Sequence, residues 1–384
     1  MWIKNFNPLI FLKSLWAGWL AVSFFMYLMF MIKHSGPVPT FDTLKVYFVE
    51  MNTTYMILIS LAAVGILFFL YHHIKVLIKQ LLIYKRFRKT EEFKKLKDTN
   101  GEVSLMSIPL TLAMTMNVMF VVSLVFIPWL WNVIESIFPI ALIFFGWIWF
   151  LGLKIYGEYF ARIMTKWNFI TAENNNLWQM IAAFAFAMIG VGFAWPAAMS
   201  NNPTTTIIAM ALSIFFLTIT FILVLIKLLV GFKEMFKKWI NTEWSPSLWI
   251  MIPILTLFGI SLVRHRHGLS HEFGAEISTI SNFVMVTIII SAQLIFGWLW
   301  YKVMRMNHYF KDFVKGAKKS IGSYALICPG VALTVFGFFF VHKGFVLTGI
   351  VEKFSITYFV MLIPIIYVQF ITIKTLFRLN KKTK

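Results

Sequence analysis

The sequence predicts an all-α membrane protein in which a single domain, residues 1–384, crosses the bilayer ten times. Composition is the first indication, because the chain is 60% hydrophobic and 18% aromatic with only 13% charged residues, more apolar surface than a soluble protein can bury. The second is a series of ten apolar segments, each long enough to span a bilayer. The third is charge, because 29 of the 35 Lys and Arg residues fall near the N-terminus, on alternate connections between these segments or in the C-terminal tail.

The predicted spans are apolar throughout and are separated by polar connections. Those of the first half are Pro8–Ile32, Tyr55–Ile78, Ser107–Trp129, Val133–Leu153 and Leu177–Ala198. Those of the second half are Thr204–Ile226, Ser247–Val263, Ile280–Trp300, Ser323–Val341 and Ile356–Ile373. The connections after the third and fifth spans are short, so the spans on either side of each are expected to be antiparallel neighbours.

The charge distribution predicts the orientation of the helices. Lys and Arg concentrate on the cytoplasmic side of a membrane, and here they cluster near the N-terminus, after every even-numbered span and in the C-terminal tail. Both termini are therefore expected in the cytoplasm, and the odd-numbered spans are expected to run outward through the plasma (inner) membrane. The connection Tyr84–Lys97 is predicted to be a charged cytoplasmic helix. The net charge of +20 is distributed as orientation signals and lipid contacts, which argues against nucleic acid as a partner.

The odd-numbered spans share a pattern that the even-numbered spans lack. Three of them open with a small polar residue followed by a proline within the first two turns, namely Ser107 and Pro109, Ser247 and Pro253, and Ser323 and Pro329. A proline inside a helix removes a backbone hydrogen bond and kinks the axis, and in lipid the freed carbonyl group needs a partner. Prolines at one depth in helices of one direction therefore predict kinks that face a shared axis. The alternative is that these residues serve helix packing alone.

Two of these stretches, S-P-S-L-W-I-M-I-P at 245–253 and S-Y-A-L-I-C-P-G-V-A-L at 323–333, resemble the tellurite-resistance/dicarboxylate transporter family, which includes the plant slow anion channels. In topology the resemblance covers essentially the whole chain. It implies ten helices arranged as five hairpins, with odd-numbered helices around a central pore and even-numbered helices outside them. It also implies a homo-oligomer, namely a homotrimer.

The ninth span departs from the family pattern at the gate. In that family a Tyr-X-Phe-Pro stretch supplies a phenylalanine that plugs the pore, whereas here Cys328 precedes Pro329. The resemblance therefore implies a pore that is wider at this level or is closed by another ring, for which Phe336 and Phe193 are the candidates. Cys328 is the only cysteine, which excludes an internal disulfide. The alternative interpretation of Cys328 is a small buried hydrophobe.

The charge content of the spans bears on mechanism. A charged residue in the middle of a span costs about 2.5–3.5 kcal/mol, and none is evident here. Coupling to protons or sodium generally needs an embedded carboxylate or broken-helix carbonyl groups. We therefore expect an anion channel or facilitative anion transporter for small or dicarboxylate anions. The alternatives are a gradient-coupled transporter or exporter of dicarboxylate, sulfur or tellurium oxyanions, and a non-transporting membrane subunit.

The stretch V-R-H-R-H-G-L-S-H-E-F-G at 263–274 is expected on the outer side, between the seventh and eighth spans. Three interpretations are open: a solvated loop, an anion-attracting mouth, and a metal site. The residues that would form the mouth are Arg264, Arg266, His267 and His271. His267 and His271 would share one face of a helix, but neighbouring arginines repel a cation, so no metal is expected.

An enzymatic function is not expected. His72 and His73 lie within the second span, and a membrane haem protein would need axial histidines paired on facing helices. The sequence contains no evident Ser/His/Asp triad, phosphate-binding loop or zinc-protease motif. No cofactor is predicted, and the expected partners are small anions and the lipid bilayer.

Overall fold

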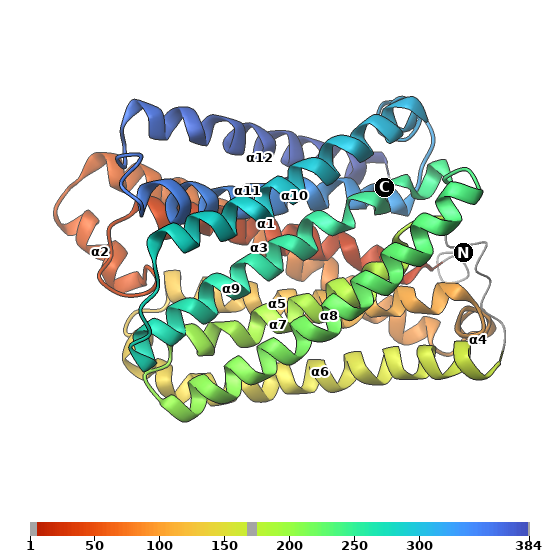
Figure 1. The fold of residues 1–384 in the computed structure, drawn as a ribbon, viewed down its shortest axis with the longest axis horizontal. Coiled ribbons are helices and arrows are strands. Elements are labelled where there is room, and N and C mark those ends of the chain that lie inside the picture. Colours follow the sequence, from red (N-terminus) through yellow and green to blue (C-terminus); the bar gives the residue numbers. More distant parts are fainter. Residues whose placement is uncertain (1–5, 167–174, 383–384) are drawn as a thin grey trace.

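The computed structural model describes residues 6–166 and 175–382 as a bundle of long helices (Figure 1). Within these residues ten helical segments are long and apolar enough to cross a membrane, which confirms the predicted number, and no strand is present. The segments are Pro8–Met31, Thr53–Phe87, Asn100–Phe126, Leu130–Thr165, Trp178–Met199, Pro203–Lys237, Thr242–Phe273, Thr279–Met306, Ile321–Val346 and Ile356–Lys382.

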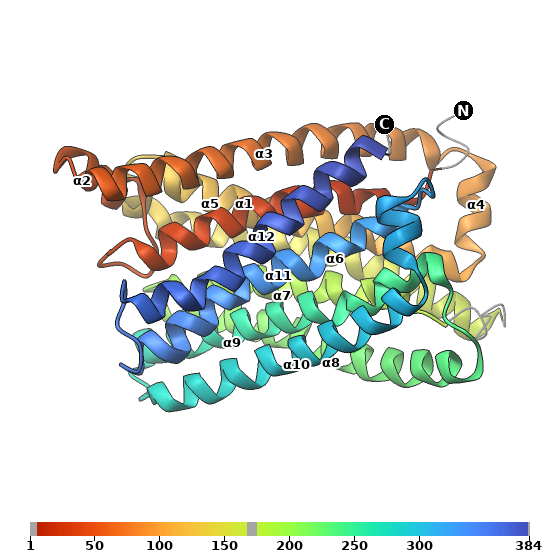
Figure 2. The same cartoon turned by 90° about the horizontal axis from the view of Figure 1, so that it is seen from above.

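The start of the first segment and the end of the last lie at the same end of the bundle, where α4 (Glu91–Lys97) also lies (Figures 1 and 2). We call this end the termini side. The opposite end, which carries the short helix α2 (Phe41–Val49), is the far side. Successive membrane-spanning helices alternate in direction between these two ends, so every odd-numbered segment begins on the termini side.

Burial separates the segments into two layers. Among the described residues, the odd-numbered segments are 61–100% buried over their most apolar windows, and the even-numbered segments are 22–39% buried. The inner helices are α1 (Leu12–Met31), α5 (Ser107–Phe126), α7 (Ile181–Met199), α9 (Met251–Phe273) and α11 (Ile327–Phe339). The outer helices are α3 (Thr53–Phe87), α6 (Ile134–Thr165), α8 (Pro203–Lys237), α10 (Thr279–Met306) and α12 (Ile356–Lys382).

The inner helices contact one another in a closed ring. In order around the ring, α1 contacts α5, α5 contacts α7, α7 contacts α9, α9 contacts α11, and α11 contacts α1. Each outer helix also contacts the inner helix that precedes it in the chain. The large apolar side chains that outer helices expose, such as Phe144, Trp147 and Phe221, therefore lie outside the ring, on the surface that a bilayer would cover.

Each inner helix begins on the termini side with a short 3₁₀ segment. These segments are Pro8–Phe11, Asn100–Met106, Trp178–Met180, Thr242–Ile250 and Ile321–Leu326. Their contacts follow the same circular order as those of the inner helices, so a second ring closes the bundle on the termini side.

Proline explains the change from 3₁₀ to α conformation in three of the inner helices. Pro109, Pro253 and Pro329 are each the third residue of their α-helix. Proline suits the first turn of a helix, where its missing N–H has no intrahelical partner to lose. It also clashes with the carbonyl group four residues earlier, so an α-helix cannot continue through it toward the N-terminus. The shared register of the prolines thus sets where each α-helix starts.

The outer helices are longer than the predicted spans. α3 and α8 each contain 35 residues, which corresponds to roughly 50 Å at about 1.5 Å per residue, against about 30 Å for the hydrocarbon core. Their additional turns lie on the termini side and carry exposed basic residues such as Lys85, Arg86 and Lys237. Lys and Arg favour helix but not lipid, so these turns continue the helices beyond the apolar stretch that the sequence marks.

Residues 263–273 of this stretch are helical, and the interpretation of it as a loop is wrong. α9 continues to Phe273 and ends at Gly274, whose φ of 64° lies in the left-handed region that glycine favours at the end of a helix. Gly268 brings α9 close to α7, because a Cβ atom at this position would collide with the backbone carbonyl group of Ala197. Gly268 is therefore a residue of a helix–helix contact and not a residue of a loop.

Buried polar side chains join the two layers. His73 of α3 lies within hydrogen-bond distance of Ser14 of α1 (3.1 Å) and Thr115 of α5 (2.9 Å). Gln369 of α12 donates a hydrogen bond to Ser23 of α1 at 2.9 Å. A buried polar group without a partner is costly in an apolar medium, so these contacts fix which faces of the outer helices pack inward.

Candidate functional site on the bundle axis

A vestibule of about 590 Å³ lies among the 3₁₀ segments on the termini side. Most of its polar lining residues carry amide side chains, namely Asn7, Asn100, Asn175, Asn176, Gln179 and Asn241. The charged residue of its described lining is Lys238. None of the residues that line it in the described part of the chain is an Asp or a Glu. Trp178 lines both the vestibule and the cavity that follows it toward the far side.

This second cavity, the proximal cavity, has a volume of about 10 Å³, close to the minimum for one water molecule. Its lining includes Trp16, Trp178, Phe184, Ser247 and Cys328. The indole N–H groups of Trp16 and Trp178 are buried and have no hydrogen-bond partner within residues 6–166 and 175–382. An unpaired buried donor costs about 1–3 kcal/mol, so two of them beside one cavity mark a place where an acceptor or an anion would be stabilised.

Three aromatic rings close the axis beyond the proximal cavity. Trp16 stacks on Phe184 at a centroid distance of 6.1 Å, and Trp19 lies 5.8 Å from the same ring. The two tryptophans stack on each other at 6.1 Å. All three side chains are at most 2% exposed. Because α1 and α7 are not consecutive in the ring of inner helices, these contacts reach across its centre. We call Trp16, Trp19 and Phe184 the aromatic plug.

A distal cavity of about 40 Å³ lies on the far side of the plug. Every inner helix contributes to its lining, which consists of Trp19, Val22, Met114, Asn117, Val121, Met188, Val191, Trp195, Leu257, Ile260, Arg264 and Val335. The cavity therefore lies on the axis that the inner helices share. Its lining is apolar apart from Asn117, Arg264 and the indole N–H of Trp195.

Arg264 is held in the distal cavity by α7. Its Nη1 donates a hydrogen bond to the carbonyl oxygen of Val191 at 2.8 Å, and its guanidinium carbon lies 3.7 Å from the ring centre of Trp195. Trp195 is fixed in turn, because its Nε1 donates to Oδ1 of Asn117 at 3.0 Å. A guanidinium group carries several N–H donors, and cation–π contact stabilises its charge without using them. Donors therefore remain for a ligand in the cavity.

The charge on the axis has one sign. No salt bridge joins Arg264 to a carboxylate in the described part of the chain, and neither axial cavity has an Asp or a Glu among its described lining residues. A charged residue within a membrane usually faces an internal cavity and is paired, and it marks a substrate or ion pathway. Arg264 has no such anionic partner among the described residues.

The serines, the prolines and the cysteine of the predicted site lie in different surroundings, and only some of them line an axial cavity. Ser247 and Cys328 line the proximal cavity. Ser107 donates to the carbonyl oxygen of Pro8 at 2.8 Å, and Ser323 shares a 2.7 Å hydrogen bond with Tyr309, so both join neighbouring segments. Ser247 also accepts a hydrogen bond from the backbone N–H of Leu177 at 3.0 Å. Pro109, Pro253 and Pro329 are buried and start their α-helices without lining either axial cavity.

The two phenylalanines expected as substitutes for the plug lie elsewhere. Phe336 packs against Gly259, between α11 and α9, and stacks on Phe339. Phe193 faces the outer layer, where it lies 5.7 Å from Phe145 of α6 and 5.8 Å from Phe216 of α8. Neither lines an axial cavity.

The residues expected at the outer mouth separate along α9. Arg264 faces the axis, whereas Arg266 faces the outer layer and donates to the hydroxyl of Ser281 on α10. The rings of His267 and His271 are 5.9 Å apart on one helix face. In the described residues no group of three or more His, Cys, Asp or Glu side chains is placed to hold a metal ion.

Sequence reasoning missed the aromatic plug and the surroundings of Arg264. Trp16 and Trp19 are three residues apart, which places them on one face of an inner helix, and this spacing was a usable signal. Phe184 and Trp195 gave none, because nearly every residue of α7 is apolar. No family model, curated protein or solved structure matches the chain, so its function is inferred from the geometry of the axis.

Proposed function

We propose that the chain is an anion channel or facilitative anion transporter in which anions pass along the axis enclosed by the inner helices. The observation that carries this proposal is Arg264, a cation beside an axial cavity without a carboxylate partner in the described residues. An anion in the distal cavity would supply the missing charge. A cation would be repelled by the guanidinium group and would meet no carboxylate there.

The magnitude favours transient anion binding. At a separation of about 4 Å and an effective dielectric constant of about 20, two opposite charges attract by about 4 kcal/mol. This corresponds to almost three orders of magnitude in occupancy, less whatever the anion loses in hydration. Conduction needs binding strong enough to admit the ion and weak enough to release it, and a single arginine without a second cation meets both conditions.

The other groups along the axis agree in sign with Arg264. An anion entering from the termini side would meet the amides and Lys238 of the vestibule and then the indole N–H groups of Trp178 and Trp16. The clustering of Lys and Arg on this side supports its assignment to the cytoplasm. The aromatic plug, to which Trp16 itself belongs, then separates the vestibule and the proximal cavity from Arg264. Apolar constrictions gate channels by excluding water, so we assign the closed state to the arrangement of Trp16, Trp19 and Phe184.

Anion flux from proteoliposomes tests the proposal. We expect efflux of chloride, nitrate or malate through the reconstituted protein, and Arg264→Gln is expected to lower it by at least about tenfold because the ~4 kcal/mol attraction is lost. The matched control is Arg266→Gln, which removes the same charge two residues along α9 from a side chain that contacts Ser281 and not the axis. The control is expected to keep nearly the full flux.

Three outcomes would decide against this mechanism. Potassium permeating in preference to chloride would overturn anion selectivity. Unchanged flux in the Arg264→Gln protein would remove Arg264 from the pathway. Malate efflux that follows an imposed proton gradient would instead support the gradient-coupled transporter as the alternative function.

A further inference from the structure

A second large cavity lies away from the axis, where α3, α4, the start of α5 and α6 meet on the termini side. Its volume of about 450 Å³ is within the range of ligand pockets. Its lining is apolar on one part and charged on the other, and consists of Leu81, Tyr84, Arg88, Phe93, Lys97, Glu102, Leu105, Ile108, Leu112, Trp147, Leu151, Lys154, Ile155 and Glu158. We call it the lateral pocket.

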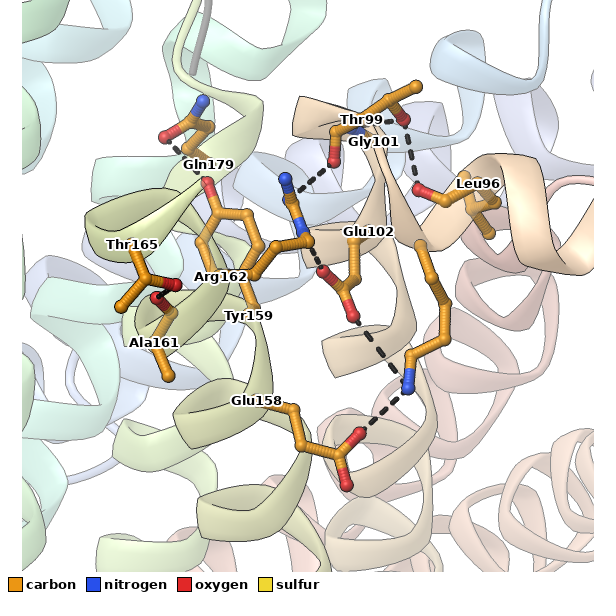
Figure 3. A network of polar contacts seen from close by, with 11 residues as sticks. Leu96, Thr99, Gly101, Glu102, Glu158, Tyr159, Ala161, Arg162, Thr165 and Gln179 are labelled. Carbon is orange, nitrogen blue, oxygen red and sulfur yellow. Dashed lines mark hydrogen bonds and ion pairs between the residues drawn. The ribbon is translucent and has the colours of Figure 1, made fainter. Parts of the chain in front are cut away.

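The two carboxylates of the lateral pocket are already paired (Figure 3). Glu102 accepts a 2.7 Å hydrogen bond from Nε of Arg162, and Glu158 forms a 2.7 Å salt bridge with Lys97. Lys97 also lies 4.0 Å from Glu102. The two remaining cations, Arg88 and Lys154, are exposed and form no salt bridge with any described carboxylate. The charge of the pocket that remains uncompensated is therefore positive.

The depth of the lateral pocket matches the edge of a bilayer. Lys154 follows the start of α6 at Ile134 by 20 residues, which is about 30 Å of helix and equals the thickness of the hydrocarbon core. Trp147, about two turns closer to the membrane centre than Lys154, is 60% exposed on the outer face of the bundle. The apolar part of the pocket therefore lies at the depth of acyl chains, and its basic rim lies at the edge of the hydrocarbon core.

We propose that the lateral pocket binds an anionic phospholipid. The phosphate would contact Arg88 and Lys154, and an acyl chain would lie along Leu112, Leu151 and Trp147. Basic pockets between transmembrane helices on the cytoplasmic side recognise anionic headgroups in this way. A zwitterionic lipid would bring its own cation to the positive rim. A soluble phosphate would leave the apolar part of the pocket empty.

The lipid would also support the inner ring. Glu102 lies in the 3₁₀ segment that starts α5, and Lys97 ends α4, so a headgroup at the rim lies against the ion pairs that hold this segment to α6. The lipid would therefore add a contact between this 3₁₀ segment of the inner layer and α6 of the outer layer. That contact would form only in a membrane that contains anionic lipid.

Thermal unfolding of the purified protein in detergent tests the proposal. We expect phosphatidylglycerol to raise the unfolding temperature of the wild-type chain, because a ligand that binds only the folded state stabilises it, and phosphatidylcholine to raise it far less. The Arg88→Gln/Lys154→Gln double variant is expected to lose more than about half of the phosphatidylglycerol-specific shift. The matched control is Lys302→Gln/Arg305→Gln, two exposed basic residues on the corresponding part of α10, which is expected to keep the shift.

Two further arms separate the sources of the signal. Leu151→Trp fills the apolar part while both cations remain, and it is expected to abolish the phosphatidylglycerol response. An equal shift with glycerol 1-phosphate, which has no acyl chain, would overturn the lipid assignment. A full shift in the Arg88→Gln/Lys154→Gln protein, or equal shifts with both lipids, would overturn the site itself.

Discussion

Truncating Phe184 to alanine is expected to open the bundle axis. Its ring forms the contacts that close the plug, at 6.1 Å from Trp16 and 5.8 Å from Trp19. Each aromatic pair contributes about 0.5–1.5 kcal/mol beyond the area it buries, so the substitution removes roughly 1–3 kcal/mol from the closed arrangement. At about 1.4 kcal/mol per factor of ten, the open fraction should rise by roughly 5- to 100-fold while it remains small.

The assay is initial anion efflux from proteoliposomes, with Phe193→Ala as the matched control. Phe193 is also fully buried on α7, but its ring contacts Phe145 and Phe216 of the outer helices. Each substitution removes one phenyl ring from α7, so the two variants should lose a similar free energy of unfolding, about 3–5 kcal/mol. Only the loss of Phe184 joins the proximal and distal cavities, so only that variant should leak anions.

Two results would refute this reasoning. Equal flux from wild-type and Phe184→Ala protein would show that the plug does not limit permeation, and equal increases from both variants would show that loosened packing is sufficient. Cys328 provides a second readout, because it is the only cysteine and lines the proximal cavity. Its labelling by a thiol reagent should become faster in the Phe184→Ala protein and stay slow in the Phe193→Ala protein.

Two further predictions concern buried groups. Glu102→Gln should lower the free energy of unfolding by about 3–5 kcal/mol, because it takes the carboxylate from the buried Arg162. Replacing both residues by glutamine should restore part of the unfolding temperature, and a double variant less stable than the single variant would contradict this explanation. Cys328→Phe should overpack the proximal cavity at a cost of about 1–3 kcal/mol. Combining it with Phe184→Ala should recover stability and low flux; simple addition of the two destabilisations would show that these side chains do not share the space.

The membrane spans could be predicted because their signal is local. A helix that crosses a bilayer needs about twenty consecutive apolar residues, so all ten spans can be located from the local composition of the sequence. The prolines at 109, 253 and 329 likewise mark the starts of their helices through a local steric effect. The additional turns of the outer helices could not be found in this way, because beyond the apolar core a basic helix and a basic loop have similar composition.

The candidate site depends on contacts between distant parts of the sequence. Arg264 lies in a polar stretch that is typical of a loop. It can lie on the axis because its guanidinium group donates a hydrogen bond to the carbonyl oxygen of Val191 and contacts the ring of Trp195. Gly268 makes this possible by letting α9 lie close to α7. Phe184 looks like any other apolar residue of α7 until its contact with Trp16 across the ring is known.

Cys328 and the aromatic plug are best understood as one feature. Cys328 lines the same small cavity as Trp16 and Phe184, so the room left by a small side chain on α11 is adjacent to large ones from α1 and α7. The resemblance places the ring that closes a pore on the ninth span, whereas here the large side chains at this level come from the first and fifth spans. Arg264 lies beyond the plug, whereas the indole N–H groups of Trp178 and Trp16, which have no partner among the described residues, lie before the plug and within it. Under the proposed function, opening the plug would connect these two sites across an apolar barrier that favours neither sign, so the rings would set the rate and Arg264 would set the selectivity.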